Sequence, residues 1–124
     1  MKRIYNYFPQ NDNIGYSPVT DTIKVHHLIS SRSGEPIKNQ FVISYQSALV
    51  KKFQSYETIC LVWDGISCVL TVYPEAFGRS VTTSKYSCAF LRDELCFSNT
   101  EIDEVKKLAK IESFGRDYPL YIQF

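Results

Sequence analysis

Residues 58–73 read TICLVWDGISCVLTVY, and this stretch decides the fold class. Two runs rich in β-branched and aromatic residues flank Asp64-Gly65, a dipeptide that is among the strongest short-range signals for a β-hairpin. We therefore expect a two-residue turn here, which places residue 60 opposite residue 69. Because both runs are almost continuously apolar, we expect the hairpin to lie in the centre of a sheet with both faces covered.

The chain on either side of this hairpin also contains strand patterns. Residues 2–8 alternate between two faces, and residues 21–30 suit a strand of mixed exposure. Residues 40–45 are rich in β-formers, whereas residues 49–56 suit either a strand or a short helix. The alternating segment 119–124 predicts a final strand after the helices.

The hydrophobic period changes after the hairpin. From about residue 83 to 96, apolar residues fall almost all round a helical wheel, which is typical of a mostly buried helix. A second helix begins at a capping box formed by Ser98 and Glu101. Phe97 and Ile102 occupy the two positions of a hydrophobic staple at the same end.

These elements predict an α+β fold. A chain of 124 residues has the length of one domain, so residues 1–124 are expected to form a single globular unit. Strands come first and helices late, which favours an antiparallel sheet of about five to six strands with two C-terminal-half helices packed on one face.

Composition narrows the functional classes. The formal net charge is +1, so the chain as a whole has no strong positive potential that would attract nucleic acid or an anionic membrane surface. Binding of either would need a local patch of positive charge. No apolar run is long enough to span a membrane, and the first residues lack the apolar core of a signal peptide. We therefore expect a cytoplasmic protein with no membrane partner.

The sequence contains no recognisable catalytic motif. His26 and His27 are its two histidines, and adjacent residues of a strand point to opposite faces, so the pair cannot serve one site. Asp64 and Asp93 are better explained as a turn residue and a helix surface residue. We therefore predict no enzymatic activity, with a small enzyme using one histidine as the weaker alternative.

The four cysteines do not indicate a metal site, because none forms a CxxC pair and the histidines lie far away in the sequence. We interpret them as reduced and mostly buried, and predict neither metal nor cofactor. They are Cys60, Cys68, Cys88 and Cys96.

The segment 78–91, GRSVTTSKYSCAFL, is the strongest candidate binding site. The first backbone N–H groups of a helix have no internal partner and attract anions, while arginine, lysine and hydroxyl side chains add charge and hydrogen bonds. The alternative is that one hydroxyl caps the helix and the cations are solvated. The candidate anion-binding residues are Arg79, Ser80, Thr82, Thr83 and Lys85.

Two other segments contain basic residues that could either bind a ligand or be simply solvated. In the loop 30–34, SSRSG, Arg32 is either a solvated turn residue or part of a shared ligand surface. Lys51 and Lys52 precede Tyr56, a mixture of cations and an aromatic ring that is compatible with nucleic-acid stacking. Lysines that protect a strand edge from aggregation explain the same pattern.

Two short motifs resemble a loose group of small uncharacterised proteins encoded by bacteriophages. The shared pattern is a Ser-Tyr-x-Thr-Ile strand, an apolar hairpin, and Ser-x-Thr-Thr-x-Lys leading into a helix with Phe-Leu. It covers about the middle third of this chain. Here Arg79 stands where an aromatic residue is commoner. The matching residues are Ser55, Tyr56, Thr58, Ile59, Ser80, Thr82, Thr83, Lys85, Phe90 and Leu91.

The resemblance implies a viral origin and favours a protein that acts by binding. We therefore expect a non-enzymatic protein that antagonises a host defence component in the cytoplasm of the host cell. It would block a host protein or sequester a nucleotide signal, with Tyr56 as a stacking surface for a phosphate-bearing ligand. The alternative is a nucleic-acid-binding regulator that uses Lys51, Lys52 and Tyr56.

Overall fold

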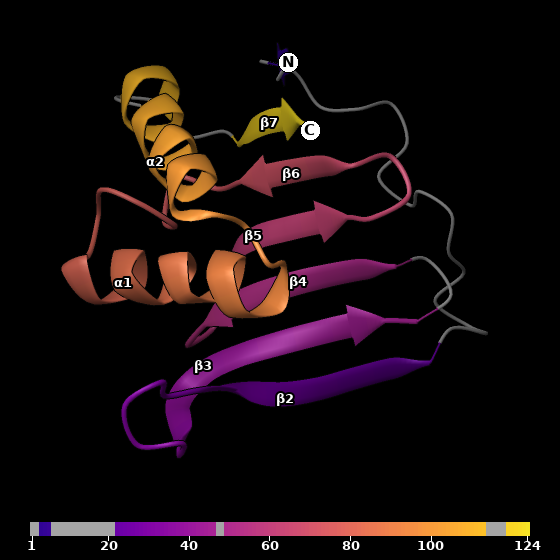
Figure 1. The fold of residues 1–124 in the computed structure, drawn as a ribbon, viewed down its shortest axis with the longest axis vertical. Helices are drawn as coiled ribbons and strands as arrows, with labels where there is room; N and C mark the ends of the chain where they lie inside the picture. The colour runs from indigo at the N-terminus through magenta and orange to yellow at the C-terminus, as the bar shows by residue number, and fades with distance from the viewer. Residues whose placement is uncertain (1–2, 6–21, 47–48, 114–118) are drawn as a thin grey trace.

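The computed structural model describes residues 3–5, 22–46, 49–113 and 119–124, and shows one antiparallel sheet with two α-helices on one face (Figure 1). The predicted α+β class is confirmed. The strands are β1 (Arg3–Tyr5), β2 (Ile23–Ile29), β3 (Pro36–Tyr45), β4 (Val50–Ser55), β5 (Thr58–Asp64), β6 (Val69–Val72) and β7 (Leu120–Gln123). The helices are α1 (Val81–Ala89), the short π-helix η1 (Phe90–Glu94) that continues it, and α2 (Asn99–Ser113).

The sheet has the strand order β1-β7-β6-β5-β4-β3-β2. Strands β2 to β6 follow one another as a meander, β7 returns beside β6 after the helices, and β1 pairs with β7. The described residues thus form seven strands, where five to six were expected. The segment 49–56, which suited a strand or a helix, forms β4.

The hairpin between β5 and β6 exists, but its predicted two-residue turn is wrong. Asp64 pairs with Val69, so four residues, 65–68, form the loop. Asp64 Oδ1 accepts hydrogen bonds from the backbone N–H groups of Ile66 (2.9 Å) and Ser67 (3.3 Å), and Oδ2 accepts one from the Ser67 hydroxyl (2.9 Å). The side chain of Asp64 therefore holds a wider loop in place of a tight turn.

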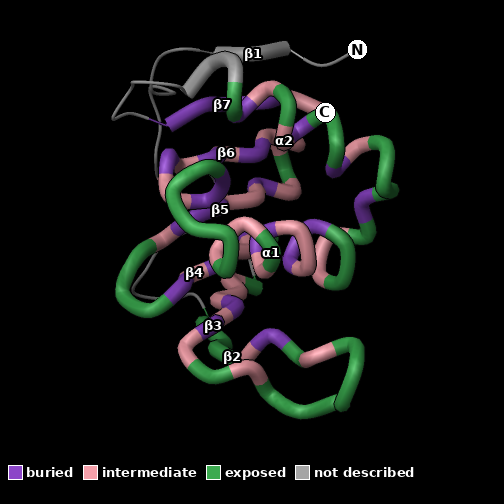
Figure 2. The backbone as a smooth tube through the Cα atoms, turned by 90° about the vertical axis from the view of Figure 1, so that its left-hand side faces the viewer, coloured by how far each residue is buried: buried purple, intermediate pink, exposed green. Residues whose placement is uncertain are grey.

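The hairpin is central in the sheet, as predicted, but its two faces differ. Leu70 and Val72 of β6 are buried under the helices, whereas Val62, Val69 and Thr71 are only partly buried. Figure 2 shows the buried residues concentrated along the middle strands, with the loop between β2 and β3 exposed. In the described part of the chain the helices cover one face of the hairpin, and the residues on its other face are half-buried.

Helix α1 is held against the sheet by the first residues of η1, which continues it. Phe90 and Leu91 are fully buried, and the Phe90 ring stacks on Phe53 of β4 with centroids 5.7 Å apart. The buried hydroxyl of Ser87 donates a hydrogen bond to the Ala76 carbonyl (2.9 Å), which fixes the helix to the loop before it. The predicted helix at 83–96 is present but spans residues 81–94, and its last turn, residues 90–94, is π-helical.

The capping box and the hydrophobic staple of α2 are confirmed. The Ser98 N–H donates to Glu101 Oε1 (3.0 Å), and the Glu101 N–H donates to Ser98 Oγ (3.2 Å). Phe97 and Ile102 are both buried beside this cap. None of the helices in the described ranges is long and apolar enough to cross a membrane.

Candidate anion-binding cleft

The start of α1 is a capped helix end. Ser80 has extended backbone angles (φ −149°, ψ 131°), and its Oγ accepts a hydrogen bond from the Thr83 N–H at 3.3 Å. The Ser84 N–H donates to the Ser80 carbonyl (3.0 Å) as the first turn closes. Capping therefore accounts for Ser80, while Thr82 is exposed and Thr83 half-buried.

Arg79 lies beside a carboxylate of its own loop. Its Nη1 donates to Glu75 Oε2 at 3.2 Å, an exposed ion pair that offsets the positive charge in front of the helix. The structure therefore does not gather Arg79 with Lys85 on one anion-binding surface.

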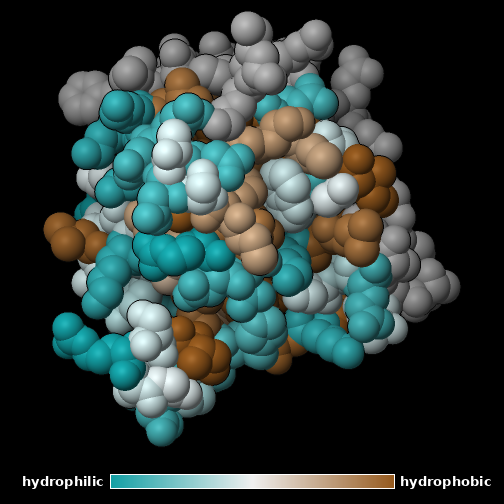
Figure 3. All heavy atoms as spheres, viewed as in Figure 1, coloured by the Kyte–Doolittle hydropathy of each residue, from teal (hydrophilic) through white to brown (hydrophobic). Residues whose placement is uncertain are grey.

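Lys85 instead lines a cleft on the side of α1 that faces the loop between β2 and β3. The cleft has a volume of about 560 Å³ and lies between residues 29–32 and residues 85–93. Arg32 from the loop and Arg92 from η1 line the same cleft. Figure 3 shows mainly hydrophilic side chains around α1 and the loop at lower left, with hydrophobic side chains between them.

The helix side of the cleft is formed by regularly spaced residues of α1 and η1. Lys85, Cys88, Ala89 and Arg92 all line it, at positions i, i+3, i+4 and i+7. Residues at this spacing share one face of a helix. Sequence reasoning found Lys85 and missed Arg92, although the seven-residue spacing between the two cations was visible.

The loop side of the cleft is fixed by its own hydrogen bonds. Ser30 Oγ accepts from the backbone N–H groups of Arg32 (3.2 Å) and Ser33 (3.4 Å). The Gly34 N–H donates to the Ser30 carbonyl (2.9 Å), and Gly34 has φ +74°, a conformation that glycine adopts without strain. These bonds hold the backbone of Arg32 in a closed turn.

The cleft is electropositive. Arg32, Lys85 and Arg92 are exposed, and none of them forms an ion pair with any residue that the structure describes. The Lys85 Nζ lies 5.5 Å from the centroid of the Tyr86 ring, which leaves its charge unneutralised. Asp93 is the one carboxylate among the described lining residues, so the lining carries a net charge of +2.

The cleft also has an apolar part and a thiol. Ile29, Ile37 and Ala89 line it together with Cys88. Burial raises the pKa of the Cys88 thiol above its ordinary value, against the lowering effect of Lys106 and Arg92. The thiol is therefore neutral near pH 7, and the cleft offers charge and shape rather than an activated nucleophile.

The structure separates the three residues of the predicted nucleic-acid surface. Lys51 points to the helix side and Lys52 to the other face, where its Nζ lies 4.9 Å from the centroid of the Tyr45 ring. Tyr56 is 60% exposed and sits in the turn at the other end of β4. Tyr56 does not line the cleft either.

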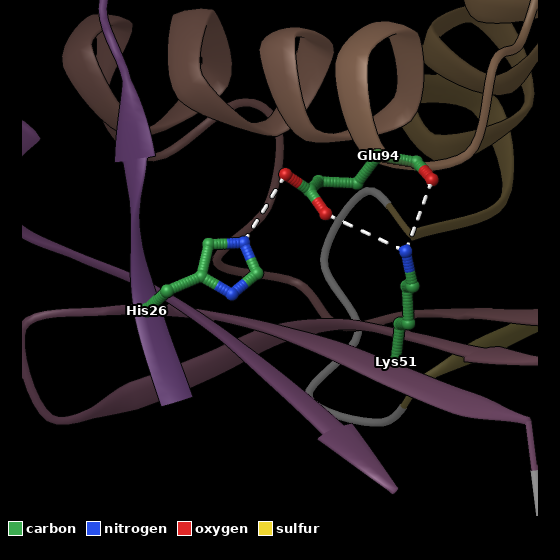
Figure 4. A network of polar contacts seen from close by, with 3 residues as sticks. All are labelled: His26, Lys51 and Glu94. Carbon is green, nitrogen blue, oxygen red and sulfur yellow. Dashed lines mark hydrogen bonds and ion pairs between the residues drawn. The ribbon is translucent and has the colours of Figure 1, made fainter. Parts of the chain in front are cut away.

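A polar network that sequence reasoning did not find joins β2, β4 and η1 (Figure 4). The His26 Nε2 lies 3.3 Å from Glu94 Oε2, and the Lys51 Nζ lies 3.5 Å from Glu94 Oε1. His27 points to the opposite face, where its Nδ1 bonds to the Ile37 carbonyl (2.9 Å). The predicted separation of the two histidines is confirmed, and both have partners within the fold.

All four cysteines are free, as predicted, but the expectation that they are mostly buried is wrong: Cys60 is buried, Cys68 and Cys88 are half-buried, and Cys96 is exposed. Within residues 22–46, 49–113 and the two short terminal strands, no group of three or more His, Cys, Asp or Glu side chains is placed to hold a metal ion. Comparisons with protein-family models, with curated proteins and with solved structures found no match.

Proposed function

We propose that this protein is a non-enzymatic binding protein that holds a phosphate-bearing small molecule in the cleft between the β2–β3 loop and α1. The observation that carries the proposal is the convergence of Arg32, Lys85 and Arg92 on one cleft without carboxylate partners. Exposed cations of a globular protein with net charge near zero are ordinarily scattered or paired, so this unpaired cluster favours an anionic ligand.

The cleft has complementary groups for the phosphate and for the base of a nucleotide. Arg32 and Arg92 can each donate two parallel hydrogen bonds to a phosphate, and Lys85 adds a point charge. The apolar residues Ile29 and Ile37 offer a surface for a base. The volume of about 560 Å³ falls within the range of small-molecule sites, roughly 300–1,000 Å³.

The biological role that fits such a site is sequestration. A protein that removes a nucleotide signal needs affinity but no turnover, and the neutral Cys88 thiol agrees with this. The resemblance to bacteriophage proteins suggests that the signal belongs to a host defence system and that binding takes place in the host cytoplasm. Blocking of a host protein is the other route to the same effect.

Isothermal titration calorimetry with inorganic pyrophosphate, a mononucleotide and a cyclic dinucleotide tests the proposal. Saturable binding of a phosphate-bearing compound, lost in Arg92→Gln and retained in Arg79→Gln, supports it. Arg79 is a matched control because it carries the same charge but is paired with Glu75 outside the cleft. Chromatography of the recovered ligand checks that it is chemically unchanged.

Other results would reject this function. If no phosphate-bearing compound binds, and a host protein co-purifies in stoichiometric amount, the protein-blocking route replaces sequestration. Binding of oligonucleotides that falls steeply with salt and depends on Lys51 and Lys52 would instead favour a nucleic-acid-binding regulator.

A further inference from the structure

Strand β2 forms an edge of the described sheet, with β3 as its neighbour. It is seven residues long and carries three exposed aliphatic side chains, Ile23 (47% exposed), Val25 (60%) and Ile29 (49%). Long edge strands with exposed aliphatic residues are templates for pairing with another chain, and proteins usually protect them. The β2 edge carries no proline.

The backbone groups that β2 turns toward the open edge follow from its register with β3. The Gln46 N–H donates to the Thr22 carbonyl (3.1 Å), and Ile23 lies opposite Tyr45 in the next pair. Hydrogen-bonded and non-hydrogen-bonded pairs alternate in an antiparallel ladder. The N–H and C=O groups of residues 22, 24 and 26 therefore point to β3, and those of residues 23, 25 and 27 point away from it.

We propose that two copies of this chain pair through their β2 strands, antiparallel and about Val25. Residue 25 lies at the centre of the outward-pointing groups, so Val25 of one copy meets Val25 of the other. This contact is isologous and closes as a two-fold dimer. It joins the two sheets into one and buries Val25, the most exposed of the three aliphatic side chains, on the face away from the helices.

Charge complementarity favours a second copy over an unrelated strand. In this register Lys24 of one copy lies opposite His26 of the other, on the helix side of the sheet. His26 contacts Glu94 of η1 at 3.3 Å. Lys24 forms no ion pair with any described residue of its own chain. The dimer therefore brings an unpaired lysine beside the carboxylate of Glu94, once on each side of the two-fold axis.

Cysteine cross-linking tests this register directly. Directly opposite, hydrogen-bonded residues of an antiparallel pair have Cα atoms about 5.5 Å apart, a distance that a disulfide can span. In a Cys96→Ser background, which removes the exposed thiol, mild oxidation should convert Val25→Cys to a covalent dimer of twice 14.3 kDa. Ile66→Cys is the matched control, because Ile66 is similarly exposed (54%) and lies in the β5–β6 loop. Equal cross-linking of the two variants, or none at position 25, overturns the proposal.

Sedimentation equilibrium over a concentration series gives an independent measurement. The unmodified chain should reach twice 14.3 kDa, Val25→Thr should do the same, and Val25→Pro should remain at 14.3 kDa. Proline removes an N–H that points away from β3, so the bonds between β2 and β3 are kept. If Val25→Pro does not fold, Lys24→Glu is the second test. In the dimer it would place a glutamate of one copy beside Glu94 of the other, so this variant should also be a monomer. An unmodified chain that is monomeric at every concentration overturns the proposal.

Discussion

Arg32 and Lys85 line the same cleft although one lies in the loop between β2 and β3 and the other on α1. Neither residue is paired with a described carboxylate. The sheet brings them together, because the β2–β3 hairpin forms its edge on the side where α1 packs.

Replacing Arg32 with glutamine should weaken the binding of a phosphate-bearing ligand about tenfold to a hundredfold, because a hydrogen bond to a charged group contributes about 1.5–3 kcal/mol. The free energy of unfolding should hardly change, since the side chain is exposed. Titration calorimetry and urea denaturation measure the two quantities. Arg79→Gln serves as the control and should leave affinity within about twofold.

Replacing Asp93 with asparagine should strengthen anion binding several-fold. Asp93 is the one carboxylate among the described lining residues of the cleft, and its removal raises the net charge of the lining from +2 to +3. The gain should fall as salt is added, because exposed charges are screened. Calorimetry at two salt concentrations measures both effects, and an unchanged or lower affinity would contradict the electrostatic interpretation.

Replacing Ser80 with alanine should lower the free energy of unfolding by about 1 kcal/mol, the usual cost of losing an N-cap. The Thr83 N–H then loses its acceptor. Ligand affinity should stay the same, because Ser80 does not line the cleft. Thr82→Ala is the control and should alter stability by less than about 0.5 kcal/mol. A large loss of affinity in Ser80→Ala would indicate that the ligand binds at the start of α1 and not in the cleft.

Replacing Gly65 with alanine should destabilise the protein by about 1–3 kcal/mol, the usual cost of overpacking. A Cβ atom at this position would lie 2.8 Å from the carbonyl oxygen of Leu49, which accepts the Gly65 N–H. The loops before β4 and after β5 would have to separate. Urea denaturation measures the loss, and Ile66→Ala at the neighbouring exposed position should cost less than about 0.5 kcal/mol.

Stability should fall in alkaline solution partly because of Cys60. Burial raises the pKa of its thiol from 9.0 to about 11, so the folded chain keeps a proton that the unfolded chain releases. The stabilisation is fully present below pH 9 and is lost as the pH rises to about 11. The difference in unfolding free energy between the native chain and Cys60→Ala should therefore shrink over this interval. A constant difference would show that Cys60 is not responsible.

Much of the fold follows from local patterns in the sequence. The capping box at Ser98, the staple at Phe97 and the alternation of residues 119–124 each depend on neighbouring residues, and each is found in the structure. The loop after Asp64 was predicted wrongly, because its width depends on hydrogen bonds from the side chain to the backbone. The π-helical turn at 90–94 was also missed, since its residues fit a helical wheel equally well.

The candidate site was predicted only in parts. Sequence reasoning singled out Lys85 and Arg32 separately, and only the placement of the β2–β3 hairpin against α1 joins them. Arg92 was detectable by its spacing from Lys85. The sequence does not show which basic residues are neutralised by a carboxylate. Arg79 pairs with Glu75, four residues away, and Lys51 pairs with Glu94, on a different element.

The order of strands has a consequence for how the protein folds. Strands β2 to β6 pair with their neighbours in sequence, so each step closes a short loop. The pairing of β1 with β7 instead joins Arg3 to Gln123, almost the whole length of the chain apart. Contacts of such long sequence separation form late and are few here, since β1 has three residues. Amide hydrogen exchange should therefore be faster in β1 than in the central strand β5, whose two hydrogen-bonded neighbours, β4 and β6, are also its neighbours in sequence.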